Sequence, residues 1–74
     1  MAWDYSKLLG KIKEKYGTQD KFAKELGMSA TTLNLKLNNK LEFTQKQMFL
    51  ACDLLNIDRS KTNDYFFEQL VKQV

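Results

Sequence analysis

The Gly-Met-Ser at residues 27–29 separates two short stretches that both have helical patterning. The stretch before it, TQDKFAKEL, begins with a threonine that can cap a helix, and the stretch after it, SATTLNLKL, begins with a serine that can do the same. Gly27 permits the left-handed backbone that ends a helix, a conformation that residues with a Cβ resist. The sequence therefore predicts two short helices that meet at a steep angle across a three-residue turn.

Small and apolar residues at fixed spacing favour close contact between these two helices. Ala23 lies four residues before Gly27, and its small side chain lets the second helix of the pair approach the first. We expect the shared core to contain Phe22, Leu26, Met28 and Leu33. This arrangement is a helix-turn-helix, in which the second helix enters the DNA major groove. The alternative is an ordinary helical hairpin with a glycine turn.

The rest of the chain is also patterned as helices. With no proline and only three glycines in 74 residues, we expect an all-α fold in one domain, residues 1–74. A first helix has Asp4 as its cap and ends at Gly17. Thr44 and Gln47 form a T-x-x-Q capping box that begins a fourth helix of about residues 45–55. The helix-turn-helix itself occupies about residues 18–38.

The last segment has the spacing of an amphipathic helix. Apolar residues follow the i, i+3, i+4, i+7 pattern at Phe67, Leu70, Val71 and Val74. We therefore expect a C-terminal amphipathic helix over about residues 63–74, which brings the number of helices to five.

The single cysteine, Cys52, lies on the apolar stripe of the fourth helix and is expected to pack in the core. A lone cysteine forms no disulfide within the chain, which favours a reducing compartment such as the cytosol. No apolar stretch approaches the roughly 20 residues of a membrane span, and no signal peptide is evident. We expect a cytoplasmic protein with no membrane partner.

The positive charge is concentrated in the first half of the chain. The net charge is +3, but residues 1–40 hold eight lysines and four acidic side chains, and residues 41–74 carry a net −1. Lys7, Lys11 and Lys15 form a row at i, i+4, i+8. A one-sided positive field suits a polyanion such as nucleic acid, although lysines also simply solvate helix faces.

The composition does not support an enzymatic function. The chain has no histidine, its one cysteine is in a core-like stripe, and no glycine-rich phosphate loop is present. The acidic residues are scattered and offer no set of metal ligands. We expect neither an enzyme nor a bound cofactor or metal.

Three segments of the chain, "TQDKFAKELGMS", "TTLNLKLNNK" and "FTQKQMFLACDLLNI", resemble the lambdoid-phage repressor and Cro-type helix-turn-helix family over about residues 5–57. The segments KLNNK at 36–40 and YFF at 65–67 are similar to those of small phage-derived transcriptional regulators. The resemblance implies a compact five-helix lambda-repressor-like DNA-binding domain that regulates transcription in the cytoplasm of a bacterial host.

The resemblance also implies roles for individual residues. Gln19 would contact phosphate from the start of the second helix, and Ser29 would cap the third helix. Ala30 and Thr31 would face bases, and Asn38 and Lys40 would reach the DNA backbone. We add nearby residues whose side chains suit contact with bases or phosphates. The predicted DNA-binding residues are then Gln19, Ser29, Ala30, Thr31, Thr32, Asn34, Leu35, Lys36, Asn38 and Lys40.

Three positions depart from the family pattern. Asn39 stands where family members often have glycine. Leu35 stands where the family often has a polar side chain that contacts bases, and it offers only apolar contact with a thymine methyl or a partner protein. Lys36 stands where many relatives have an apolar core residue, so we expect its stem to pack inward while its ammonium reaches a phosphate.

The second half of the chain holds more apolar residues than one core needs. These residues either pack against Trp3 and Phe43 or form a protein interface, most simply that of a homodimer. A dimer would place its two recognition helices about 34–36 Å apart, one turn of DNA. The candidate interface residues are Phe49, Leu50, Leu54, Phe66, Phe67 and Leu70.

Two functions follow from these features. The first is sequence-specific binding of double-stranded operator DNA by a repressor or Cro-like regulator, with phosphates anchored by lysines and bases contacted through Thr31 and its neighbours. The second is an antirepressor or modulator that keeps the fold but binds a partner repressor protein. Leu35, the modest net charge and the surplus apolar residues are compatible with the second function.

Overall fold

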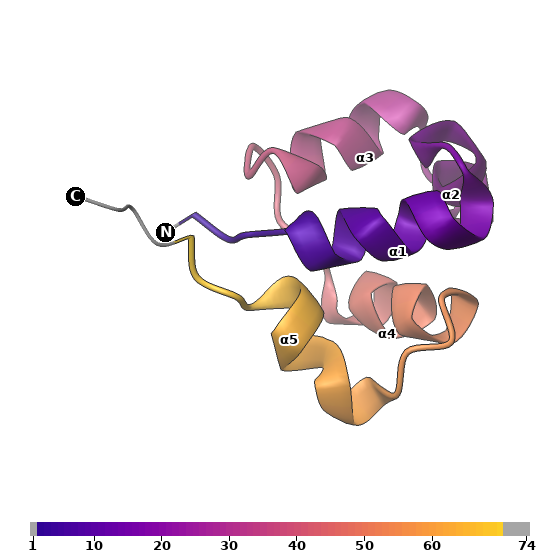
Figure 1. Ribbon diagram of the computed structural model, residues 1–74. Helices are drawn as coiled ribbons and strands as arrows, with labels where there is room; N and C mark the ends of the chain where they lie inside the picture. The colour runs from indigo at the N-terminus through magenta and orange to yellow at the C-terminus, as the bar shows by residue number, and fades with distance from the viewer. Residues whose placement is uncertain (1, 71–74) are drawn as a thin grey trace.

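The computed structural model describes residues 2–70, which form five α-helices and one short 3-10 helix (Figure 1). In chain order the elements are α1 (Ser6–Tyr16), α2 (Gln19–Leu26), α3 (Ala30–Leu37), α4 (Gln45–Leu54), η1 (Arg59–Lys61) and α5 (Thr62–Phe66). In the view of Figure 1, α1 crosses the middle of the molecule, between α3 and the pair formed by α4 and α5. The predicted all-α, five-helix fold class is confirmed for this part of the chain.

Three of the four longer helices begin at the predicted caps. The hydroxyl oxygens of Thr18 and Ser29 accept hydrogen bonds from backbone N–H groups three residues on, at 3.4 and 3.1 Å. Thr44 and Gln47 form the complete capping box, in which each side chain accepts from the other residue's backbone N–H, at 3.1 and 3.0 Å. These bonds satisfy N–H groups that have no partner inside the helix, so local sequence determines where the three helices start.

The first helix begins one residue later than expected. Tyr5, rather than Asp4, is the N-cap residue of α1, and it makes no side-chain capping bond. The Asp4 carboxylate still accepts a hydrogen bond from the Ser6 N–H at 2.9 Å, and it also accepts one from the Ser6 hydroxyl. Hydrogen bonds from the Ser6 side chain and backbone lower the pKa of Asp4 below its ordinary value. Asp4 therefore stabilises the helix start from outside the cap position.

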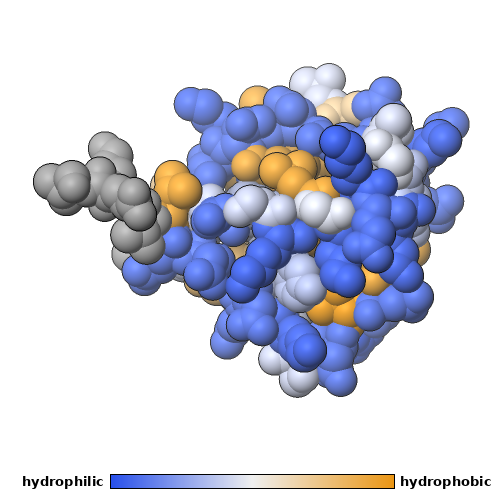
Figure 2. Space-filling model, in the orientation of Figure 1, coloured by the Kyte–Doolittle hydropathy of each residue, from blue (hydrophilic) through white to orange (hydrophobic). Residues whose placement is uncertain are grey.

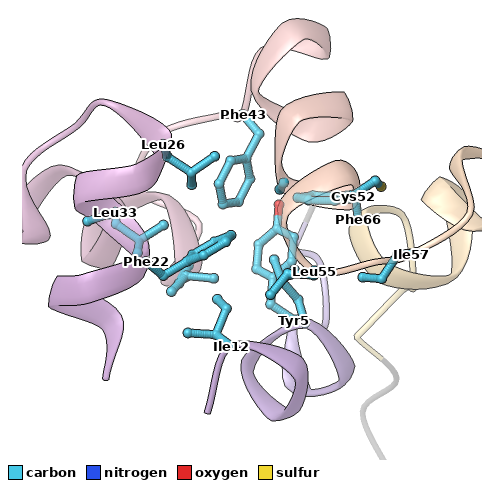
Figure 3. Close-up of a cluster of buried hydrophobic side chains, with 14 residues drawn as sticks. Tyr5, Ile12, Phe22, Leu26, Leu33, Phe43, Cys52, Leu55, Ile57 and Phe66 are labelled. Carbon is cyan, nitrogen blue, oxygen red and sulfur yellow. The ribbon is translucent and has the colours of Figure 1, made fainter. Parts of the chain in front are cut away.

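A single apolar core joins the helices (Figure 3). Phe22, Leu33 and Phe66 are almost completely buried in it, together with Cys52, whose expected packing role is confirmed. The rings of Tyr5, Phe43 and Phe66 pack edge-to-face, with centroids 5.2–6.4 Å apart, and link the start of α1 to the loop before α4 and to α5. The core thus fixes the side of α3 that is turned away from solvent.

The C-terminal segment differs from the prediction. A helix over residues 63–74 is wrong as far as residue 70, because α5 ends at Phe66, and residues 71–74 lie outside the described part. The chain instead pairs with the N-terminal segment. Asp4 N–H donates to the Glu68 carbonyl at 2.7 Å, and Leu70 N–H donates to the Ala2 carbonyl at 3.3 Å. Pairing with residues far away in the sequence therefore overrides the helical spacing of Phe67 and Leu70.

Candidate functional site

The turn between α2 and α3 has the predicted geometry. Gly27 has φ 77° and ψ 28°, the left-handed conformation, and the Met28 N–H donates to the Ala23 carbonyl at 3.0 Å. Such bonds satisfy the last carbonyls of a helix. Ala23 and Leu33 are buried where the two helices meet. The turn is confirmed as a turn; its role in a DNA-binding helix-turn-helix stays a prediction.

The first turn of α3 presents one free side chain to solvent. Thr31 is exposed, whereas Ala30 and Thr32 are half-buried. The Ser29 hydroxyl donates to the Thr32 hydroxyl at 2.9 Å and accepts from the Thr32 N–H, so both hydroxyls are occupied in holding the helix start. Of this predicted group, Thr31 is therefore the residue best placed to touch a partner.

Farther along α3, two predicted residues bond to each other. The Asn38 amide donates to the Asn34 backbone carbonyl at 2.8 Å and to the Asn34 side-chain oxygen at 3.2 Å. Both residues are exposed. Their amides help to terminate the helix, and a contact with a partner would compete with these bonds.

Lys36 differs from its predicted role at a phosphate. Its stem packs inward as expected, but the ammonium is also turned inward, and the residue is only 7% exposed. Lys36 Nζ donates to the Glu42 carbonyl at 2.6 Å and lies 5.8 Å from the centroid of the Phe43 ring. A buried ammonium needs such partners because it has lost its hydration. Residues 30–38 contain no other cationic side chain, so the outer face of α3 has no exposed positive charge.

The loop after α3 explains the asparagine where the family often has glycine. Asn39 has φ 63°, a left-handed conformation that glycine and asparagine adopt most easily. Its amide forms two hydrogen bonds with the Trp3 backbone: the Trp3 N–H donates at 2.8 Å, and the Trp3 carbonyl accepts at 3.0 Å. Asparagine therefore permits the turn and also fastens the N-terminal segment to the loop. Lys40, next in the chain, is exposed.

An apolar surface begins at Leu35, in the last turn of α3. Leu35 is 38% exposed, and its carbonyl accepts hydrogen bonds from the N–H groups of Lys40 and Leu41. This loop brings Leu41, 46% exposed, next to the end of the helix. Leu41 is not among the residues predicted from the sequence, because it lies in a loop and belongs to no helical pattern.

A hollow of about 300 Å³ continues this surface towards the chain termini. Leu41, Trp3 and Phe67 are among its lining residues, and the rings of Trp3 and Phe67 pack edge-on with centroids 5.4 Å apart. Tyr5 also lines it, and burial, followed by the charge of Glu42, raises the pKa of the Tyr5 phenol. We call the group Leu35, Leu41, Trp3 and Phe67 the Leu35–Phe67 surface.

Gln19 lies apart from the Leu35–Phe67 surface. It is the first residue of α2 and is half-buried, and it lines a separate shallow hollow of about 280 Å³ with Leu9, Gly17 and neighbouring residues. The side of the molecule drawn in Figure 2 shows hydrophobic residues gathered in a strip framed by hydrophilic ones. Of the predicted DNA-binding residues, Lys36 is the one that the structure turns inward, and the contact of Gln19 with phosphate stays a prediction.

The structure buries some of the predicted interface residues and leaves others exposed. Phe66 is wrong as an interface residue, because it is 1% exposed and belongs to the core. Phe49 is half-buried, and the Arg59 guanidinium lies 5.0 Å from its ring centroid. Leu54 packs against the core. The exposed members are Leu50 at 39%, Phe67 at 41% and Leu70 at 56%.

The part of the chain described, residues 2–70, contains no group of three or more His, Cys, Asp or Glu side chains that could hold a metal ion. None of its helices has the length and apolar character needed to cross a membrane. What the described part does offer is a mixed polar and apolar surface at α3 and its following loop.

Two of the comparisons with known proteins gave a match. Residues 1–69 match the model of a family described as "Protein of unknown function (DUF739)". The fold is similar to the solution structure of the modulator of repression (MOR) of the temperate bacteriophage TP901-1 from Lactococcus lactis, with a TM-score of 0.78, 43% sequence identity and 90% of each chain covered. The search of curated proteins gave no match.

Proposed function

The chain belongs to the DUF739 family, and from this membership and its likeness to a phage modulator of repression we propose that it modulates repression by binding a partner repressor protein. This is the second of the two functions considered from the sequence. Direct binding of operator DNA, and the narrower assignment to the repressor and Cro family, have less support. We place the action in the cytoplasm of a bacterial host and propose no enzymatic step.

The observation that carries this proposal is the composition of the outer face of α3. Proteins that bind DNA obtain most of their affinity from lysines and arginines at phosphates. On α3 the one lysine, Lys36, is buried against Glu42 and Phe43, and the exposed apolar residue is Leu35. A leucine beside another exposed leucine, Leu41, suits an apolar patch on a protein better than a phosphate chain.

We propose that the repressor covers the Leu35–Phe67 surface. Leu35 and Leu41 would supply apolar area, and the hollow beside Trp3 and Phe67 would accept one side chain of the repressor. Thr31, at the other end of α3, would make a polar contact at the rim. Most interfaces depend on a few apolar or aromatic residues, and Leu35 is the exposed apolar residue that α3 contributes here.

The first prediction is that Leu35→Gln weakens repressor binding at least tenfold. The substitution keeps a good helix former and a similar size, but it replaces apolar contact with an amide that must be desolvated, which costs about 1–3 kcal/mol. The measurement is isothermal titration calorimetry of the chain with a repressor from the same phage or prophage genome. Leu50→Gln is the matched control, because Leu50 is 39% exposed and Leu35 is 38% exposed. Leu50 lies on α4, so its replacement should leave the affinity within about twofold, well below the tenfold effect of 1.4 kcal/mol.

A gel shift separates this proposal from DNA recognition by α3. The exposed Thr31 after a glycine turn favours DNA recognition as a second candidate function. If the chain alone shifts the operator and Thr31→Ala changes its site preference, α3 binds DNA and the proposal fails. If the chain alters the repressor's shift of the operator and alone shows no preference for the operator over other duplexes, the proposal holds. Light scattering in the same samples tests the homodimer, for which exposed Leu50 and Phe67 remain candidates.

A further inference from the structure

The excess positive charge of the chain resides on one helix. α1 carries four lysines (Lys7, Lys11, Lys13 and Lys15) and one acidic residue, Glu14, a net +3 that equals the net charge of the entire chain. Outside α1, eight cationic side chains are balanced by eight acidic ones. The electrostatic field of the molecule is therefore centred on α1 and not on α2 or α3.

Three of these lysines form a row along one side of the helix. Lys7, Lys11 and Lys15 are spaced by four residues, which corresponds to a rise of about 6 Å per step and about 12 Å for the row. Lys7 and Lys15 are exposed and Lys11 is half-exposed. A row of about 12 Å with three ammonium groups can reach about two or three phosphates of a DNA backbone. We call these three residues the α1 lysine row.

Helix stability does not account for the row. Lysine near the C-terminus of a helix is favourable, because it faces the negative end of the helix dipole, and this explains Lys13 and Lys15. Lys7, however, is in the first turn, where the dipole favours acidic residues and α1 has none. The ion pair of Lys11 with Glu14, at 3.9 Å and with the glutamate 66% exposed, contributes little.

The surroundings of the row fit a phosphate chain and not a membrane. A helix that lies on a membrane needs exposed apolar residues beside its cations. The apolar residues of α1 face the core: Leu8 and Ile12 are buried, and Leu9 and Tyr16 are packed against it. We propose that the α1 lysine row binds the phosphate backbone of duplex DNA, without preference for base sequence. This proposal does not depend on repressor binding at α3.

The test is fluorescence anisotropy of a labelled 20-base-pair duplex of arbitrary sequence, titrated with the full chain at several salt concentrations. A plot of log K against log salt should have a slope of about −2 to −3, as expected for two or three neutralised phosphates. The variant Lys7→Gln/Lys11→Gln/Lys15→Gln should lose at least tenfold in affinity at low salt, with a slope near zero. The matched control Lys24→Gln/Lys46→Gln/Lys61→Gln removes the same charge from exposed sites outside α1 and should stay within about threefold of the native chain.

Two further variants test whether removal of a negative charge beside the α1 lysine row tightens DNA binding. Glu14→Gln removes the acidic neighbour of the row and should tighten DNA binding about threefold, whereas Glu25→Gln on α2 should have no such effect. Circular dichroism verifies folding; if the triple variant unfolds, each single replacement in the row should flatten the slope by about 0.9. Equal losses from both triple variants, or no DNA binding by the native chain at low salt, would overturn the proposal. Row-dependent binding to phosphatidylglycerol vesicles in the absence of DNA binding would overturn it too.

Discussion

Two glycines of this chain occupy different backbone conformations and should respond in opposite ways to the same substitution. Gly10 lies in the middle of α1, and Gly27 has φ 77° at the end of α2. A Cβ added at either position would meet no atom within 4 Å, so steric overlap with neighbours does not enter the comparison. The difference lies in the backbone alone.

The prediction is that Gly10→Ala stabilises the fold and Gly27→Ala destabilises it. Alanine in an exposed helix interior gains about 0.5–1 kcal/mol over glycine. Alanine in the left-handed region costs about 1–2 kcal/mol. Urea unfolding followed by circular dichroism measures both changes in the free energy of unfolding. A stabilising Gly27→Ala would show that the turn between α2 and α3 is not the left-handed turn described here.

At the scale of elements, the chain termini are held together by contacts that join distant parts of the sequence. The Asn39 side chain forms hydrogen bonds with the backbone of Trp3 on one side of the N-terminal segment. On its other side, this segment pairs with the backbone of the segment that contains Glu68 and Gln69. The N-terminal segment therefore lies between the loop after α3 and the end of the chain that follows α5. This arrangement also positions Trp3 in the Leu35–Phe67 surface.

Replacement of Asn39 separates its two contributions. Asn39→Gly removes the hydrogen bonds to Trp3 but tolerates φ 63°, whereas Asn39→Ala removes the bonds and strains the backbone as well. We expect the glycine variant to lose about 1 kcal/mol and the alanine variant about 1 kcal/mol more. Unfolding curves measure both losses, and the emission of the single tryptophan, Trp3, reports loosening of its segment. Equal stability of the native chain and the glycine variant would contradict a structural role for the two bonds.

Local signals in the sequence predicted the starts of α2, α3 and α4, because Thr18, Ser29 and Thr44 cap helices through bonds to residues only three positions away. The C-terminal segment could not be predicted in this way. Its helical spacing is outweighed by backbone pairing with residues 2–4, more than sixty positions earlier in the chain. The adjacent Phe66 and Phe67 could not be told apart from local sequence either. Only tertiary packing determines that Phe66 is buried in the core and that Phe67 is exposed on the surface.

At the scale of the whole molecule, charge and apolar area belong to different elements. The positive charge identified in the first half of the sequence is on α1, while α3 presents Leu35. From the sequence, Leu35 is recognisable as a departure from the family pattern that offers only apolar contact with a thymine methyl or a partner protein. The sequence predicted that the stem of Lys36 packs inward, but not that its ammonium also turns inward, because the partner of the ammonium is the carbonyl of Glu42 in a loop. Leu41 and Trp3 join Leu35 only through that loop and the N-terminal segment.

Binding of a partner repressor at the Leu35–Phe67 surface is the central proposal for this protein. The most direct measurement is a titration of the ¹⁵N-labelled chain with the repressor, followed by amide chemical shifts in NMR spectra. We expect the largest changes at Thr31, Leu35, Leu41 and Phe67, with small changes at Leu50 on α4. Changes confined to α4, or no change at α3 while the repressor is bound, would contradict the account.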